Sequence, residues 1–267
     1  MKIDLDIRKT IEENAAIYFE RSKKAKRKLA GTREIIRKTQ QNIADLQEKA
    51  SEEHEVQEQK RLTPAVKKEW FEKFRWCQSS DGFLIVGGRD ATTNEIIIKK
   101  YTDPNDLVFH TESPGSPFVV IKNPEKKDIP ESTRQEAAEL CGIFSRSWKA
   151  EQSVAEVFMV TPQQVSKEAQ AGEFIAKGSF MIYGHKTFFH VDLKPAIVVD
   201  GARPMCGPLG SIKPYAQKSN LSFLELVNGN EKLSNVAKII AKRLGGQLDD
   251  IIRTLPQGVA LRKEKKK

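Results

Sequence analysis

Residues 81–123 read DGFLIVGGRDATTNEIIIKKYTDPNDLVFHTESPGSPFVVIKN, and short apolar runs alternate there with turn-forming residues. Runs of about four residues rich in Val, Ile and Phe, bounded by Gly, Pro, Asn and Asp, are typical of β-strands. We therefore predict four strands, at Phe83–Val86, Ile96–Ile98, Leu107–Phe109 and Phe118–Ile121. Gly87 and Gly88 should form a tight turn with no helix after it, and so not a dinucleotide-binding loop. Polar residues occupy the turns, where we expect the function to lie.

The first sixty or so residues predict a short strand followed by a coiled-coil arm. Met1–Ile7 alternates apolar and polar residues, which indicates a strand. From residue 8 to about residue 53, a 4-3 spacing continues through Gly31, and nine of its twelve positions are apolar. This heptad seam predicts one helix, roughly 70 Å long. The seam positions are Ile11, Ala15, Tyr18, Ser22, Ala25, Leu29, Thr32, Ile36, Thr39, Ile43, Leu46 and Ala50.

Such a seam needs another helix to bury it. We expect either a second copy of the chain, giving a homodimer through residues 11–50, or an earlier helix if the chain is a piece of a longer protein. Residues 51–63 lose the period and predict a linker. The helix also carries a basic run without any acid, which can contact RNA phosphates or can simply be a solvated face. This arm patch consists of Arg21, Lys23, Lys24, Lys26, Arg27 and Lys28.

The remainder of the chain predicts an α+β fold, a mixed, mainly antiparallel sheet with flanking helices. We expect helices at residues 64–75, 132–150, 231–244 and 248–255, and further strands at Val154–Val160, Ser179–Tyr183, Phe188–Val191, Ala196–Val199 and Leu221–Val227. The Pro- and Gly-rich residues 204–214 predict a boundary, and residues 262–267 a basic tail. The predicted domains are therefore an arm at 1–60, an α+β domain at 61–200 and an α+β extension at 201–267.

Composition narrows the class of partner. The 267 residues carry a formal net charge of +9, which favours RNA, DNA or another polyanion, although a merely soluble basic protein has the same property. The three cysteines are far apart and form no zinc or disulfide pattern, so we expect a reducing, cytoplasmic location. We find no signal-peptide pattern and no apolar run long enough to span a bilayer, so we expect no membrane partner.

Catalytic patterns are sparse. Asp106, His110 and Glu112 cluster at one predicted strand and are the candidates for general acid–base catalysis. An acid four residues from a histidine on a strand lies about 13 Å away along the chain, so these groups need not touch. No serine elbow or Walker loop accompanies them, and His185 and His190 lack a third metal ligand. We expect no catalytic residue, cofactor or metal, and keep a nucleic-acid-processing enzyme centred on His110 as an alternative.

The turns favour RNA binding. Gly115 lets the backbone approach a ligand, and the amides around it can form an anion-binding nest, although a tight connection into the next strand explains it equally. Basic side chains on neighbouring turns, with Tyr101 and Tyr183 for stacking, would add contacts if the turns converge. The predicted RNA-binding residues are Arg89, Asn94, Lys99, Lys100, His110, Gly115, Ser116, Lys122, Arg134, Arg146, Lys167, Lys177 and Lys186.

Several motifs in this order resemble the NFACT-R domain of the RqcH/NFACT family of ribosome quality-control proteins. They are Trp70–Trp76, Ser80–Phe83, Gly88–Ala91 with Asn94 and Glu95, Asp106 with His110 and Gly115, Gln164–Lys167, Gly172 with Glu173, and Lys177–Tyr183. The resemblance covers about residues 1–200, and the last segment resembles an archaeal-type extension. Two positions depart from the family pattern, because Pro114 stands where members often have His and Glu112 where they often have Asp.

The resemblance implies a role at the ribosome. Full-length relatives bind the large subunit carrying a stalled peptidyl-tRNA and recruit tRNA for C-terminal tailing, with the coiled coil reaching toward the stalk base and the NFACT-R domain contacting tRNA. We find no counterpart of the family's N-terminal domain or helix-hairpin-helix module, so we do not expect tailing by this chain alone. We expect an RNA-binding component of ribosome quality control that contacts tRNA and large-subunit RNA. A coiled-coil dimerising scaffold and a general DNA binder are further alternatives.

Overall fold

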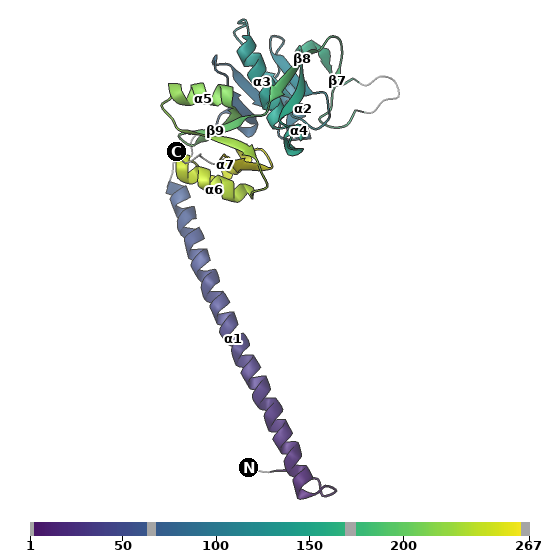
Figure 1. The fold of residues 1–267 in the computed structure, drawn as a ribbon, viewed down its shortest axis with the longest axis vertical. Helices are drawn as coiled ribbons and strands as arrows, with labels where there is room; N and C mark the ends of the chain where they lie inside the picture. Colours follow the sequence, from purple (N-terminus) through teal and green to yellow (C-terminus); the bar gives the residue numbers. More distant parts are fainter. Residues whose placement is uncertain (1–2, 63–67, 169–174, 263–267) are drawn as a thin grey trace. The chain divides into compact units, whose positions relative to one another are not determined.

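The structure, a computed structural model, describes residues 3–62, 68–168 and 175–262. The chain divides into two compact units, residues 1–66 and residues 67–267. The first is built on one long helix, and the second combines helices with antiparallel sheets (Figure 1). This architecture confirms the predicted α+β class with a long helical arm. Within the described ranges, no helix is long and apolar enough to cross a membrane.

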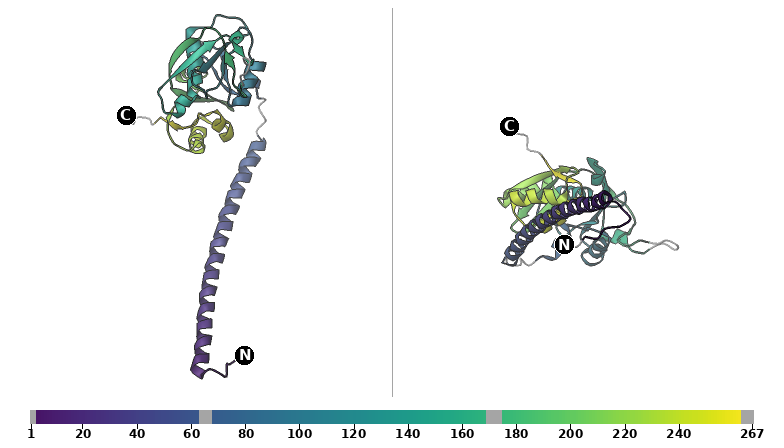
Figure 2. Two further views of the ribbon diagram at one scale, coloured as in Figure 1. Left: turned by 90° about the vertical axis from the view of Figure 1, so that its right-hand side faces the viewer. Right: turned by 90° about the horizontal axis from the view of Figure 1, so that it is seen from below.

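The arm is one continuous helix, α1 (Ile11–Leu62), in each view (Figure 1, Figure 2). A capping box starts it, because Glu13 N donates to Thr10 Oγ1 at 3.2 Å and Thr10 N donates to the Glu13 carboxylate at 2.9 Å. The predicted linker at residues 51–63 is wrong, since α1 continues to residue 62. Residues 51–62 are rich in Glu and Gln and contain no Gly or Pro, so losing the heptad period does not end the helix.

The predicted strand at the start of the chain is also wrong. Residues 3–6 have no regular structure and lead into a turn before α1. The Tyr18 hydroxyl donates to Asp4 O at 2.6 Å, and Asp6 N donates to Asn14 Oδ1 at 2.9 Å. This segment therefore folds back along the first turns of a helix, and the described part of the unit offers no strand with which it could pair.

Most of the heptad seam of α1 is exposed over residues 11–43, and Tyr18 is half-buried. Leu29, Ile36 and Ile43 are 54%, 51% and 49% exposed, although they stand at seam positions. A row of half-exposed apolar side chains at this spacing is the surface through which helices pair in coiled coils.

The second unit, which we call the α+β domain, is centred on a six-stranded antiparallel sheet with the order β1-β2-β4-β3-β5-β8. These strands are β1 (Arg75–Gln78), β2 (Leu84–Gly87), β3 (Leu107–Thr111), β4 (Val119–Ile121), β5 (Val154–Val160) and β8 (Thr187–Asp192). Alternate residues of β4 enter two cores, because Val119 packs with Leu140 of α3 (Glu131–Ile143) and Val120 packs with Ile97 of α2 (Ala91–Lys100). The two helices therefore cover opposite faces of the sheet.

Ile96–Ile98, predicted to be a strand, lies in α2. Asp90 caps this helix, because its carboxylate accepts from Thr93 N at 2.8 Å and its own N donates to Thr93 Oγ1 at 2.9 Å. Three consecutive isoleucines do not by themselves distinguish a strand from a helix, and only the middle one is fully buried here. A helix therefore does follow Gly87 and Gly88, contrary to the prediction.

Two further helix predictions need correction. The start predicted at residue 64 lies outside the described residues, and the part from residue 68 forms only a short 3-10 helix, η1 (Trp70–Lys73), before β1 begins. The helix predicted at 132–150 is divided into α3 and α4 (Arg146–Lys149). The division occurs because Ser145 caps a new helix, its side chain accepting from Ser147 N at 3.1 Å.

A second sheet, of order β10-β9-β11-β12, shares one apolar core with the first. Its strands are β9 (Pro195–Asp200), β10 (Arg203–Pro208), β11 (Phe223–Asn228) and β12 (Val259–Leu261), with helices α5 (Leu209–Lys218), α6 (Leu233–Leu244) and α7 (Leu248–Thr254) (Figure 1). The boundary predicted at 204–214 is instead a strand and a helix, because an edge strand such as β10 tolerates proline. The strand predicted at 179–183 is reduced to β7 (Met181–Ile182), and within the described residues its partner is β6 (Val165–Ser166).

Candidate nucleic-acid interface

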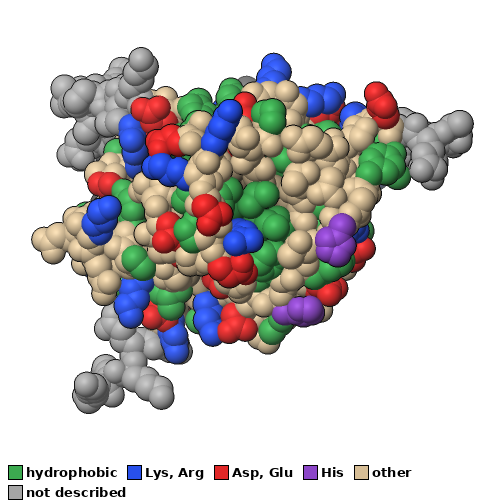
Figure 3. All heavy atoms as spheres, turned by 90° about the horizontal axis from the view of Figure 1, so that it is seen from above, with side chains coloured by type: hydrophobic (Ala, Val, Ile, Leu, Met, Phe, Trp, Pro, Cys, Tyr) green, Lys and Arg blue, Asp and Glu red, His purple; other side chains and the backbone are tan. Residues whose placement is uncertain are grey.

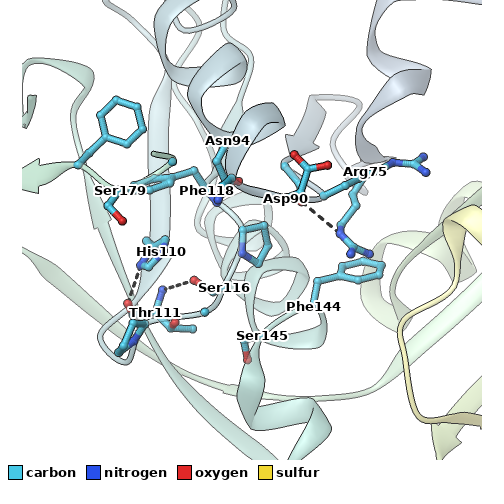
Figure 4. Close-up of a pocket in the computed structure, with 18 of the residues that line it drawn as sticks. Arg75, Asp90, Asn94, His110, Thr111, Ser116, Phe118, Phe144, Ser145 and Ser179 are labelled. Atoms are coloured by element: carbon cyan, nitrogen blue, oxygen red, sulfur yellow. Dashed lines mark hydrogen bonds between the residues drawn. The ribbon is translucent and has the colours of Figure 1, made fainter. Parts of the chain in front are cut away.

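The α+β domain contains a cleft of about 660 Å³ between α2, the β3–β4 connection, α4 and the segment before β7. Figure 4 shows Arg75 beside Phe144 at one end of it and His110 beside Thr111 at the other. A cleft of this size suits a small ligand or a nucleotide. The charged side chains that line it are Arg75, Arg89, Lys149, Lys177 and Lys186, against Asp90 and Glu112. The lining is therefore predominantly basic.

Asn94 ties α2 to the central sheet at this cleft. Its side chain is buried, and its Oδ1 accepts from Phe118 N at 3.1 Å. A Cβ on Gly88 would lie only 1.8 Å from that oxygen, so glycine is required for the approach. The side-chain oxygen of Asn94, a predicted RNA-binding residue, is therefore already bonded within the fold. Asn94, Gly88 and Phe118 line one wall of the cleft.

The connection from β3 to β4 forms the opposite wall. Thr111 N donates to Ser116 Oγ at 3.1 Å, and His110 Nδ1 lies 2.7 Å from Thr111 O. The His110 ring packs on Phe118 at a centroid distance of 4.4 Å, and burial lowers the pKa of the imidazole. Gly115 has a φ of +105°, which favours glycine. This turn therefore holds a neutral histidine ring at the edge of the cleft.

Arg75 is a cleft residue that the sequence analysis missed, as it missed Lys149 and Phe180. Its Nε donates to Gly88 O at 3.2 Å, and its guanidinium lies 3.9 Å from the centre of the Phe144 ring. Its Nη1 is buried without a hydrogen-bond partner. Burial, followed by repulsion from Arg89, lowers the pKa of Arg75 to about 10. No local pattern marks this arginine, because Phe144 reaches it only through the fold.

Arg89 supports the backbone around the cleft. Its guanidinium donates to Phe74 O at 2.9 Å and to Arg253 O at 3.1 Å, which joins β1 to the end of α7. Its Nε, like Arg75 Nη1, is buried without a partner. Burial, followed by repulsion from Arg253, lowers the pKa of Arg89. Among the described residues, neither Arg75 nor Arg89 forms an ion pair with a carboxylate.

The cleft brings together residues that the sequence analysis selected from separate turns. Lys177 and Lys186 come from the segment on either side of β7, and Lys186 pairs with Glu112 at 3.0 Å. Lys177 precedes Gly178, whose Cβ, if present, would lie 2.5 Å from Ala91 Cα at the start of α2. The predicted RNA-binding residues that line the cleft are Arg89, Asn94, His110, Gly115, Ser116, Lys177 and Lys186.

Other predicted RNA-binding residues lie outside the cleft lining. Lys99 and Lys100 end α2, and Lys99 pairs with Glu95 at 2.7 Å. Arg134 pairs with Glu131 on α3 at 3.4 Å. Arg146 packs over the β3–β4 turn, where a Cβ on Gly115 would lie 2.5 Å from its Nε. Lys167 donates to Ala176 O and Ser179 O, both at 2.9 Å.

The three acid–base candidates do not form one site. Asp106 is 1% exposed, forms a close ion pair with Lys122, and accepts from Asn123 N at 2.8 Å. His110 lies at the cleft with Thr111, and Glu112 engages Lys186 at its edge. Lys122 therefore balances a buried charge. Among the residues that the structure describes, no cluster of three or more His, Cys, Asp or Glu side chains is placed to hold a metal.

The two predicted stacking tyrosines lie in different settings. Tyr101 is stacked on Trp70, with ring centres 4.5 Å apart and planes within 5°, so one of its faces is covered. Tyr183 is 40% exposed, and its N donates to Gln164 O at 2.9 Å. Tyr183 directly follows Ile182, the last residue of β7, which lines the cleft. Tyr183 itself does not line it.

Surface charge is distributed differently on the two units. On the face shown in Figure 3, basic and acidic side chains are interspersed, without a continuous basic area. On the arm, all six residues of the arm patch are exposed, and Lys23 lies 3.9 Å from Glu20 in a loose ion pair. With 3.6 residues per turn, these six side chains surround the sides of α1 that the seam leaves free. A partner helix on the seam would therefore leave the arm patch accessible.

Comparison with known proteins supports a single family. Residues 73–184 match the family described as "NFACT protein RNA binding domain". The chain is 37% identical over 199 residues to the archaeal Rqc2 homolog aRqcH of Methanocaldococcus jannaschii, covering 72% of this chain and 29% of that protein. It is 37% identical over 194 residues to the ribosome quality control complex subunit NEMF homolog of Drosophila melanogaster, covering 70% of this chain and 18% of that protein.

Human NEMF, also named as a ribosome quality control complex subunit, is 37% identical over 176 residues, which are 66% of this chain and 16% of that protein. The chain thus spans less than a third of the length of these relatives. All residues that line the cleft, except Lys186, Pro256 and Gln257, fall inside the matched range 73–184. The chain is a member of the RqcH/NFACT family, and residues 73–184 are its NFACT RNA binding domain.

Proposed function

We propose that this chain binds RNA as a component of ribosome quality control and engages tRNA and large-subunit RNA where a peptidyl-tRNA has stalled. The observation that carries the proposal is the coincidence of the matched RNA binding domain with the basic cleft. The names of the relatives, which are ribosome quality control subunits, supply the cellular setting. In this proposal the protein acts in the cytoplasm, on RNA and not at a membrane.

Two surfaces contribute to the proposed binding. The cleft recognises single-stranded or unstacked RNA, because it combines basic side chains with aromatic rings. The arm patch adds contacts to phosphates that carry no sequence information. The exposed seam of α1 pairs with another helix, and a second copy of the chain is one such partner.

The full chain should be titrated with tRNA, duplex DNA and large ribosomal subunits across a series of salt concentrations. The proposal predicts a preference for tRNA or the large subunit that persists near physiological salt. Equal binding to all three that disappears as salt rises would reduce the interaction to general phosphate attraction and would contradict the proposal.

The oligomeric part of the proposal has a separate test. Sedimentation of the full chain should reveal a dimer that Ile36→Asp dissociates, because the change places a charge in the seam. Ile35→Asp is the matched control, since Ile35 is 66% exposed but lies outside the seam. A wild-type chain that remains monomeric at high concentration would exclude the homodimer and leave RNA binding unaffected.

A further inference from the structure

We propose that the cleft of the α+β domain binds one nucleotide of a single RNA strand, with its phosphate on Arg75 and Lys177 and its base against His110 and Phe180. That the nucleotide belongs to an RNA strand rests on the proposed function. Free nucleotides carry the same chemistry, so the test below separates the two sources.

The guanidinium of Arg75 provides the anion site. Its Nε donates to Gly88 O, while Nη1 is buried and has no acceptor among the residues that the structure describes. A buried donor without an acceptor is costly, and a charged one especially so. Stacking on Phe144 holds the plane of the group in place. An arginine fixed in this way offers parallel N–H groups, the geometry that matches a phosphate.

The charges around Arg75 point to the same ligand. Asp90 lies beside Arg75 in Figure 4, but its carboxylate is committed to the cap of α2 through Thr93 N. Lys177 lines the cleft beside Gly178, which packs on Ala91 at the start of α2, so a second, exposed cation lies near Asp90. Arg89 adds a third positive charge near Asp90 and Asp250, and it forms no ion pair with a carboxylate among the described residues. The negatively charged phosphate of a nucleotide would offset part of this positive charge.

The other end of the cleft has the character of a base-binding wall. His110 and Phe180 are half-buried, and both pack on the buried ring of Phe118, at centroid distances of 4.4 Å and 5.3 Å. Both residues line the cleft, and the Lys167 Nζ lies 5.0 Å from the centre of the Phe180 ring. Rings backed in this way are stacking surfaces for an unpaired base. The cleft therefore has a cationic end for the phosphate of a nucleotide and an aromatic end for its base.

The experiment follows binding of cytidine, cytidine 5′-monophosphate and a short single-stranded RNA to the full chain by NMR titration. The monophosphate should shift the signals of Arg75 Nε–H and of the His110 ring, and cytidine should bind about tenfold more weakly or worse. Arg75→Gln should weaken monophosphate binding by between about tenfold and a hundredfold. Arg262→Gln, an arginine paired with Glu225 outside the cleft, is the control and should bind like the wild type.

A second variant covers the case in which Arg75→Gln does not fold. Lys177→Gln changes an exposed side chain and should still weaken monophosphate binding severalfold. If the cleft binds an RNA strand, the short RNA should displace the monophosphate. Monophosphate binding that the RNA does not displace would identify a free nucleotide as the ligand and would overturn the proposal of an RNA strand. If the wild-type chain binds RNA but the NMR signals of its cleft residues do not shift, this inference is overturned and the proposed function is not. Absence of any RNA binding overturns the proposed function, while monophosphate binding that depends on Arg75 would still establish the phosphate site.

Discussion

The arm and the α+β domain use basic residues in opposite ways. On α1 the arm patch is exposed, and Lys23 alone contacts an acid, loosely, among the side chains that the structure describes, so these charges remain available to a partner. In the domain, many of the lysines and arginines that appear equivalent in the sequence are held by neighbouring groups. Lys122 balances Asp106, Lys99 pairs with Glu95, and Arg89 binds backbone carbonyls. A basic residue therefore indicates a binding surface only after its partners within the fold are known.

The largest effect expected is from Lys122→Met. This change leaves Asp106, which has no exposed side chain, without its cation, and should lower the free energy of unfolding by about 3 kcal/mol or more. Lys23→Met on the arm is the control and should change it by less than about 0.5 kcal/mol, because its ion pair is exposed. Urea unfolding measures both. Equal effects of the two substitutions on the free energy of unfolding would contradict the distinction between partnered basic residues in the domain and exposed ones on the arm.

Gly88→Ala should come next. Its Cβ would lie 1.8 Å from Asn94 Oδ1 and break the bond to Phe118 N, which should cost about 2–3 kcal/mol of stability. Gly31→Ala meets no atom within 4 Å and should instead increase the helicity of the arm by favouring the helix by roughly 0.5–1 kcal/mol. Circular dichroism and thermal unfolding distinguish these outcomes. A neutral Gly88→Ala would mean that α2 and β4 are not tied together in this way.

The stability of the domain should also depend on pH through Glu139 of α3. Burial raises the pKa of this carboxyl to about 7, so the folded state binds a proton that the unfolded state has already lost between about pH 4.5 and 7. Stability should therefore fall as the pH rises through this window, by about 1–2 kcal/mol. Glu139→Gln should reduce that slope, as measured by urea unfolding at pH 5.5 and 8, and Glu136, whose pKa burial also raises, should supply the remainder. A slope unchanged by the substitution would assign the effect to other groups.

The smallest effect concerns RNA affinity, with no change in stability. Reversing the charge of Lys23, Lys24, Lys26 and Arg27 to Glu should lower tRNA affinity at low salt by about tenfold and reduce its dependence on salt. The melting temperature should stay the same, because all four side chains are exposed. Full tRNA affinity in this variant would show that the arm patch is only a solvated face.

The sequence indicated the elements whose signals are local. β3, β4, β5, β8 and α6 follow runs of apolar residues with clear turn residues around them, and the capped, periodic α1 was also predicted. The strand predicted at Ile96–Ile98 was wrong because Asp90 caps a helix there, and the sequence analysis did not recognise this cap. The cleft could be predicted only in part. Arg75 was missed because Phe144 and Gly88, which define its role, are separated from it along the chain.

Crosslinking tests most directly the claim that the cleft is the RNA-binding surface of the domain. The full chain, saturated with tRNA, is irradiated with ultraviolet light, and the crosslinked peptides are identified by mass spectrometry. The account predicts crosslinks on the peptides that contain His110 and Phe180, with loss of both when a short single-stranded RNA competes. Crosslinks confined to the second sheet or the arm, with the cleft peptides unmodified at saturation, would contradict it.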